Sequence, residues 1–267
     1  MVPAIRPAST VMLLRAEERA PSFEVLMLRR SAKSAFAPDV FAFPGGAVEP
    51  ADYSDQARAR IHGLDRARLA RMFRATRAAS LDDPTLAELE DADRAALMVA
   101  AARELFEEGG VLLGKPLNSD VGIASLNDAR DALWHGESDF AEILRNHDLW
   151  LDASGLELFS VWVTPPNEAR RFYAHFFIAR ADRQLAAADR VETHDEIWIE
   201  PKAALSEYEA ARFAMVYPTI KHIERLAAFG SVEEVLEFAC TKPILRIMPH
   251  TRREHGFSLP AELENAW

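Results

Sequence analysis

One helix near the middle of the chain constrains the fold most. Residues 97–108 have helical spacing, and the run "AARELFEEGGVLLG" (101–114) ends this helix at two glycines. Segments of strand character lie on both sides of it, at 9–16, 23–30 and 40–43 before the helix and at 157–166, 170–180 and 195–201 after it. Strands that flank a central helix in this way predict an α+β fold, with a mixed β-sheet covered by helices.

The same helix gathers three carboxylates at its end. Glu104, Glu107 and Glu108 stand at i, i+3 and i+4 and therefore share one helix face. Like charges at these spacings destabilise a helix, and the C-terminal end of the helix dipole favours cations instead. A bound divalent cation such as Mg²⁺ would offset both the repulsion between the carboxylates and the unfavourable helix dipole. A solvated acidic surface is the alternative that these three residues alone leave open.

Composition excludes several classes of protein. The chain has 267 residues, 49% of them hydrophobic, enough for one large domain with elaborations or two small ones. A protein that binds nucleic acid through its overall charge is usually basic, so the net charge of −11 argues against a nucleic-acid partner. Cys240 is the only cysteine, which excludes an internal disulfide and a cysteine-based zinc site. Because no stretch has the length of a membrane span and the first apolar run is short for a signal peptide, we expect no membrane association and a cytoplasmic location.

The segments around the strands predict additional helices. Residues 53–95 are rich in alanine and arginine and then acidic, which predicts an insert of two or three helices. Helices are also expected at 203–215, 218–229 and 231–238, the last with a capping box formed by Ser231 and Glu234, and residues 249–267 should be irregular. We therefore divide the chain into a domain at 8–230, which contains the insert 53–95, and a C-terminal helical extension and tail at 231–267.

Two stretches together resemble the signature of the Nudix hydrolases. "FPGGAVEPAD" and "RELFEEGGV" follow the pattern G-x5-E-x7-R-E-U-x-E-E-x-G-U, where U is a large aliphatic residue. Gly46 opens the motif, and its second half is matched without exception by Arg103, Glu104, Leu105, Glu107, Glu108, Gly110 and Val111. Asp52 replaces the first glutamate, and 50 residues instead of seven separate it from Arg103. The resemblance covers about residues 8–230 and implies a Nudix-type α/β/α sandwich with a mixed sheet.

Weaker signals are similar to one branch of this family. The large insert, "LMLRRS" (26–31) and "RRFYAHFFIAR" after "WVTPP" resemble the peroxisomal coenzyme A diphosphatases of animals and their bacterial relatives. This resemblance implies metal-dependent hydrolysis of a nucleoside diphosphate linked to another moiety, with coenzyme A, an acyl-coenzyme A or a similar ADP-containing metabolite as substrate. Two alternatives stay open: a non-catalytic Nudix-like ligand sensor, and a pyrophosphatase for dinucleoside polyphosphates or capped RNA.

The resemblance also implies roles for single residues. The metal, Mg²⁺ with Mn²⁺ as an alternative, would be held by Glu104, Glu107, Glu108 and the carbonyl of Gly45. The general base that deprotonates water is expected to be Glu196, which precedes a tryptophan-bearing strand, with Glu107 or Glu108 as its rivals. The residues with structural roles in the motif would be Gly46, Asp52, Arg103 and Gly110. Arg103, one turn before Glu107, is expected to hold that carboxylate in place.

Arginines are the candidate ligands of substrate phosphate. Arg29, Arg170 and Arg171 are expected to face the pocket, and the alternative for the last two is an ordinary pair at a strand edge. Seven arginines concentrate in the insert (Arg58, Arg60, Arg66, Arg68, Arg71, Arg74 and Arg77). One or two of them are expected to contact substrate, unless they pair with the acidic stretch 82–93. The partner is then a small nucleotide, and a homodimer is left open.

Overall fold

A mixed β-sheet forms the centre of the molecule. The computed structural model describes residues 3–16, 22–30, 39–63, 65–73, 88–116, 123–181, 196–252, 256–264 and 267. The strands of the sheet run in the order β10 (Glu196–Ile199), β2 (Phe23–Arg29), β1 (Ile5–Ala16), β9 (Arg171–Arg180), β8 (Leu156–Val163) and β11 (Arg246–Ile247). Two short strands join at the side, β3 (Phe41–Ala42) on β2 and β4 (Gly45–Ala47) on β1. The β1–β9 and β8–β11 pairs are parallel and the remaining pairs antiparallel, so the predicted mixed sheet is confirmed.

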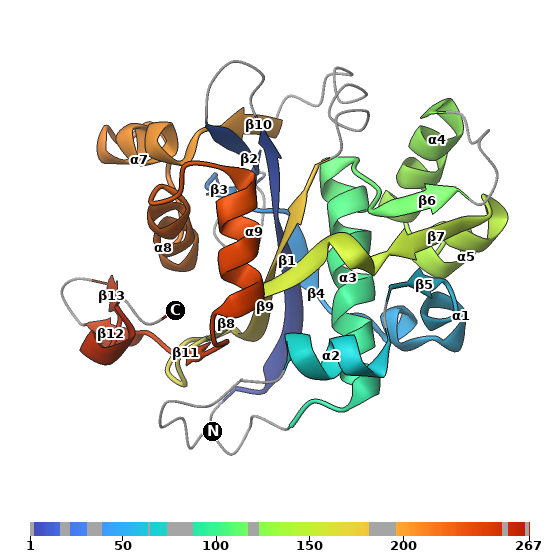
Figure 1. The fold of residues 1–267 in the computed structure, drawn as a ribbon, viewed down its shortest axis with the longest axis horizontal. Helices are drawn as coiled ribbons and strands as arrows, with labels where there is room; N and C mark the ends of the chain where they lie inside the picture. The colour runs from blue at the N-terminus through green and yellow to red at the C-terminus, as the bar shows by residue number, and fades with distance from the viewer. Residues whose placement is uncertain are drawn as a thin grey trace.

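Helices cover both faces of this sheet (Figure 1). One face packs against α3 (Asp91–Gly109) and α2 (Arg66–Met72), and the other against α7 (Pro201–Glu209), α8 (Tyr217–Leu226) and α9 (Val232–Thr241). The strands are apolar on both sides for this reason: in β1, Val11 and Leu13 face the α3 side, whereas Met12 and Leu14 face the other. The α/β/α sandwich expected from the resemblance is therefore present.

A lobe with its own apolar core lies beside α3, on the side away from the sheet (Figure 1). It contains α1 (Asp55–Arg58), α4 (Ile123–Trp134), α5 (Phe140–Asn146) and a small sheet in the order β5 (Ile61–His62), β7 (Leu149–Asp152) and β6 (Gly114–Pro116). The predicted insert is thus only partly helical, because β5 pairs in parallel with β7. α3 begins at Asp91, inside the predicted insert, and the bounds 53–95 stay a prediction.

The C-terminal part differs from the prediction in two places. The helix expected at 203–215 ends at Glu209, because Ala211 adopts a left-handed turn (φ 56°). This turn lets Phe213 reach the core, where its ring stacks on Phe41 at 3.7 Å between centroids. The tail expected to be irregular contains the hairpin of β12 (His250–Arg252) and β13 (Gly256–Ser258), and a 3₁₀ helix at Ala261–Leu263.

The helical extension shares the core of the sandwich. Ser231 begins α9 as its N-cap, and its hydroxyl accepts a hydrogen bond from the Glu234 amide at 3.2 Å. Val235 of α9 and the terminal residue Trp267 are buried in the same cluster as α8. The division of the chain at residue 230 stays a prediction, but the described part packs as one body. No helix in the described ranges combines the length and apolar character that crossing a membrane requires.

Candidate active site

The last turn of α3 lies against β4 at the centre of the candidate site. β4 pairs with β1 through Gly45 opposite Thr10 and Gly46 opposite Ser9. The Glu108 carboxylate accepts a hydrogen bond from the Gly45 amide at 2.9 Å, which ties the helix end to the strand. Gly46 approaches so closely that a β-carbon on it would lie 2.3 Å from a Glu104 oxygen. A side chain at position 46 would therefore displace the Glu104 carboxylate from its position beside Arg103.

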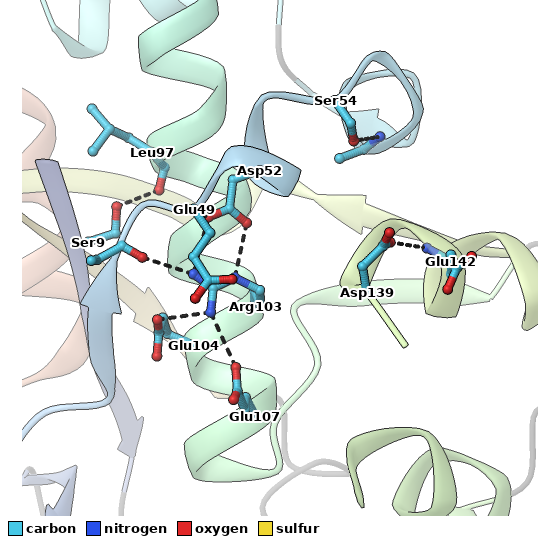
Figure 2. Close-up of polar contacts among 12 residues, drawn as sticks. Ser9, Glu49, Asp52, Ser54, Leu97, Arg103, Glu104, Glu107, Asp139 and Glu142 are labelled. Atoms are coloured by element: carbon cyan, nitrogen blue, oxygen red, sulfur yellow. Dashed lines mark hydrogen bonds and ion pairs between the residues drawn. The ribbon is translucent and has the colours of Figure 1, made fainter. Parts of the chain in front are cut away.

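Arg103 organises the carboxylates of the site (Figure 2). Its Nη1 donates to Glu104 Oε1 at 2.9 Å and to Glu107 Oε2 at 3.2 Å. Its Nε and Nη2 donate to the two oxygens of Asp52 at 3.0 and 3.1 Å, and Nη2 also donates to the Ala47 carbonyl at 3.0 Å. The guanidinium is buried, so these bonds form in a low-dielectric environment where charge-assisted contacts are strong.

Asp52 binds Arg103 although its side chain is shorter than that of the glutamate in the family pattern. It lies in a short 3₁₀ helix (Pro50–Tyr53), is 1% exposed, and accepts a further hydrogen bond from the Glu49 amide at 2.8 Å. This turn brings the main chain close to α3, so an aspartate reaches Arg103 with both oxygens. The 43 residues added to the motif therefore leave the Asp52–Arg103 pair intact.

The surroundings of the three glutamates disfavour the charged form of each carboxyl group. Burial, together with repulsion from Glu108 and Glu107, raises the pKa of Glu104 to about 8. Burial also raises the pKa of Glu107 and of Glu108, against the attraction of Arg103 and the Gly45 hydrogen bond respectively. A divalent cation would favour the charged form of all three, and carboxylate oxygen is the donor type that Mg²⁺ and Mn²⁺ prefer.

The donor set therefore fits a metal, although its oxygens are engaged with protein groups here. Within the described ranges, no group of three or more His, Cys, Asp or Glu side chains is already arranged around one metal position. Glu104 and Glu107 point to Arg103, and Glu108 points to Gly45. Metal ligation by the three glutamates and by the Gly45 carbonyl remains a prediction.

Glu196 lies at the edge of the same site. It is the first residue of β10, pairs with Leu28 of β2, and its side chain is 13% exposed. Its Oε1 lies 3.4 Å from Nη2 of Arg130, a residue of α4. Arg130 also donates to the Glu107 and Glu108 carbonyls at the end of α3. Glu196 is thus joined to the carboxylate-bearing turn through one side chain.

Comparison with known proteins agrees with this geometry. The family model of the NUDT19 Nudix domain matches residues 5–226. The chain belongs to the Nudix hydrolases. It is 26% identical to the acyl-coenzyme A diphosphatase NUDT19 of Xenopus laevis, over 91% of this chain and 69% of the relative, and 25% identical to that of Gallus gallus, over 90% and 72%. A crystal structure of a NUDIX hydrolase from Alicyclobacillus acidocaldarius is similar with a TM-score of 0.59 and 26% identity, covering 89% of this chain and 97% of that one.

Two of the arginines expected to bind substrate lie elsewhere in this Nudix hydrolase. Arg171 pairs with Ile5 at the start of β1, five residues and thus roughly 17 Å from Thr10 beside Gly45. It is buried, and its guanidinium donates to the Thr164 carbonyl at 3.1 Å and to the Pro3 carbonyl at 3.4 Å. Arg170 precedes it in an exposed turn. This placement argues against the expected phosphate contacts, because the sheet holds both residues at its other end.

The third arginine, Arg29, lies nearer the site. It follows Leu28, the cross-strand partner of Glu196, at the end of β2. Its guanidinium forms an exposed ion pair with Asp39 at 2.6 Å. Substrate binding by Arg29 stays a prediction, and it would require the guanidinium to exchange this partner for phosphate.

The described arginines of the insert bind protein groups. Arg68 donates to Glu157 at 2.9 Å and to the Ala153 and Leu156 carbonyls at 3.0 Å each, and Arg71 pairs with the same glutamate at 3.2 Å. Arg66 pairs with Asp91 at 3.3 Å. For these three arginines the contacts argue against substrate binding, because they dock the insert on β8 and α3. Arg74, Arg77 and residues 82–87 lie outside the described residues.

Arg130 is the site residue that sequence reasoning missed. Its neighbours "DARDALW" (128–134) carry no motif, and no spacing relates position 130 to the Nudix signature. Its contacts with Glu107 and Glu196 span 23 and 66 residues of sequence. The only signal for it is the tertiary structure.

Proposed function

We propose that this Nudix hydrolase cleaves the diphosphate bond of coenzyme A and acyl-coenzyme A. The observation that carries the proposal is the intact carboxylate cluster around Arg103, which a 43-residue insertion has not disrupted. The names of the relatives matched over nine-tenths of the chain support the substrate class. Coenzyme A contains a nucleoside diphosphate linked to another moiety, the kind of bond that the resemblance implies.

Glu104, Glu107, Glu108 and the Gly45 carbonyl would hold Mg²⁺, or Mn²⁺ as the alternative. Bound there, the cation would neutralise negative charge that builds on the diphosphate during attack by water. Arg103 keeps the heads of Glu104 and Glu107 in fixed orientations, and the Gly45 amide does the same for Glu108. These contacts preorganise the cluster before substrate arrives.

Glu196 is the proposed general base. It lies beside the carboxylate-bearing turn without being part of it, and its carboxylate could take a proton from the attacking water there. Glu107 and Glu108 are the rivals for this role. The products would be adenosine 3′,5′-bisphosphate and 4′-phosphopantetheine or its acyl ester.

A panel of substrates tests the proposal. Coenzyme A, acetyl-coenzyme A, ADP-ribose and diadenosine tetraphosphate are each incubated with the protein and Mg²⁺ or Mn²⁺, and the products are separated by chromatography. We expect the coenzyme A compounds to give the highest kcat/KM and activity to vanish with a chelator. Glu107→Gln or Glu108→Gln should lower kcat by a factor on the order of 10²–10⁴.

Two results would contradict this proposal. Full activity of both glutamine variants would end the metal-ligand assignment, and a clear preference for a substrate other than coenzyme A would end the substrate assignment. A small nucleotide is the partner under this proposal. The homodimer and the cytoplasmic location stay predictions from the sequence.

A further inference from the structure

Arg130 binds the end of the carboxylate-bearing helix and the proposed base at once. Its Nε donates to the Glu107 carbonyl at 2.9 Å, and its Nη2 donates to the Glu108 carbonyl at 2.6 Å. The same Nη2 lies 3.4 Å from Glu196 Oε1. Carbonyls in the last turn of a helix have no partner within the helix, and a cation is favourable there because of the helix dipole. Arg130 therefore satisfies two such carbonyls and brings a charge that attracts Glu196.

The two arginines of the site hold different parts of the same turn. Arg103 binds carboxylate heads, whereas Arg130 binds the main chain of Glu107 and Glu108. Arg103 belongs to α3 itself, but Arg130 belongs to α4, whose Ala129 and Leu133 are packed in the core of the lobe. The lobe thus fixes the position of a side chain that reaches into the site of the sandwich.

We propose that Arg130 is a positioning residue that holds Glu196 at a fixed place relative to the metal-binding glutamates. The proposal rests on the proposed function, because it assigns Glu196 and the last turn of α3 to the same reaction. β10 and α3 are far apart in sequence, and Arg130 bonds directly to both. A catalytic group displaced by about 1 Å can lose a factor of about 10² in rate, so such a bridge would act on turnover rather than on binding.

Arg60 is a matched control within the same lobe. Its Nη1 donates to the Leu144 and Leu149 carbonyls, both at 3.1 Å, and lies 3.4 Å from Asp148 Oδ1. The side chains of Arg60 and Arg130 are each 22% exposed. Both arginines therefore bind two carbonyls and one carboxylate from similar depth, but Arg60 does so away from the glutamates of α3.

Steady-state kinetics of the full chain with Mg²⁺ separate positioning from stability. Arg130→Gln should lower kcat by about 10- to 100-fold and leave KM for acetyl-coenzyme A within about twofold. Arg130→Lys should recover part of kcat, since an ammonium replaces the charge but not the planar fork. Arg60→Gln should lower the melting temperature comparably and leave kcat within about twofold. In the double variant with Glu196→Gln, the loss should be smaller than the product of the single losses.

Hydrogen–deuterium exchange of the metal-free protein provides a readout independent of activity. Arg130→Gln should raise exchange in peptides that cover 103–112 and 196–200, and Arg60→Gln only in those that cover 143–152. Unchanged exchange in both site peptides overturns the proposal, as does a kcat for Arg130→Gln or Arg130→Lys no lower than that of Arg60→Gln. If the wild type hydrolyses none of the substrates while Arg130→Gln loosens both site peptides, the proposed function fails and the bridge itself stands.

Discussion

Arg103 lies where the Asp52, Glu104 and Glu107 carboxylates meet, and its contacts show how the site tolerates a changed motif. The glutamate of the family pattern is replaced by Asp52, yet both aspartate oxygens bind Nε and Nη2 of Arg103. The pair is buried on both sides, at 1% exposure for Asp52 and 4% for Arg103. A buried arginine that loses such a partner keeps a charge that water cannot reach.

This pairing predicts the effect of Asp52→Ala. The change should lower the free energy of unfolding by about 3–5 kcal/mol, because it leaves the Arg103 charge incompletely paired. Urea denaturation followed by circular dichroism measures it. Asp139→Ala serves as the control, since Asp139 is an exposed N-cap of α5 and should cost only about 1 kcal/mol. Equal losses in the two variants would show that the Asp52 pair contributes little.

A second residue-scale prediction concerns Glu196. If it is the base, Glu196→Gln should lower kcat by a factor on the order of 10²–10⁴ and leave KM nearly unchanged, because glutamine keeps the shape but cannot accept the proton. The measurement is initial rate against coenzyme A concentration at several pH values. Near-normal turnover would transfer the role to Glu107 or Glu108.

Among the elements, α3 carries the site on its last turn and ends there for a structural reason. Gly110 adopts φ 65°, and its amide bonds back to the Phe106 carbonyl at 3.0 Å. Residues with a β-carbon avoid this left-handed conformation, whereas glycine adopts it readily. Gly110 thus allows the chain to leave the helix two residues beyond Glu108.

The left-handed turn predicts a difference between two glycine variants. Gly110→Ala and Gly136→Ala should each lower the free energy of unfolding by about 1 kcal/mol, because both glycines have φ near 65–70°. Gly136 has open space around its α-carbon and lies in the lobe, after α4. Only Gly110→Ala should also lower kcat, since it strains the turn that carries Glu107 and Glu108. Thermal melts and rates of both variants test this, and equal rates would contradict it.

On the scale of the whole molecule, the glutamate cluster couples stability to pH and metal. The pKa of Glu104 is raised from 4.5 to about 8 in the folded protein, with burial as the main cause. Between about pH 4.5 and pH 8, the Glu104 carboxyl is therefore protonated in the folded state and ionised in the unfolded state. The stabilisation is present below about pH 4.5 and is lost as the pH rises through about 8.

This coupling predicts how the metal-free protein responds to pH. With a chelator present, the free energy of unfolding should fall by an amount on the order of a few kcal/mol between pH 5 and pH 8.5, relative to the variant Glu104→Gln. Denaturant titrations of both proteins at each pH measure the difference. Saturating Mg²⁺ should remove most of the fall, because a cation that binds only the folded state stabilises it. A constant difference between the two proteins across this pH range would contradict the prediction.

Much of the architecture was predictable because it depends on patterns among residues that are close in sequence. The apolar, aromatic and β-branched runs of β1 and β9 and the helical spacing of α3 involve only residues close in sequence, so the sequence alone predicts these elements. The carboxylates Glu104, Glu107 and Glu108 were identifiable for the same reason, since a helix alone places them on one face. The sequence predicts that the helix ends at its two glycines, and the structure places the left-handed residue at Gly110.

The tertiary structure alone decided which charged residues meet. No local feature of the sequence distinguishes Arg171 from Arg130. The register of β9 on β1 buries Arg171 at the far end of the sheet, whereas the docking of α4 brings Arg130 to Glu196. A guanidinium has the same local pattern whether its partner is a phosphate, a carboxylate or a carbonyl. Which partner it meets depends on the strand order and on how the lobe packs beside α3. The Asp52–Arg103 and Arg130–Glu196 contacts join residues 51 and 66 positions apart, so no local sequence pattern predicts them.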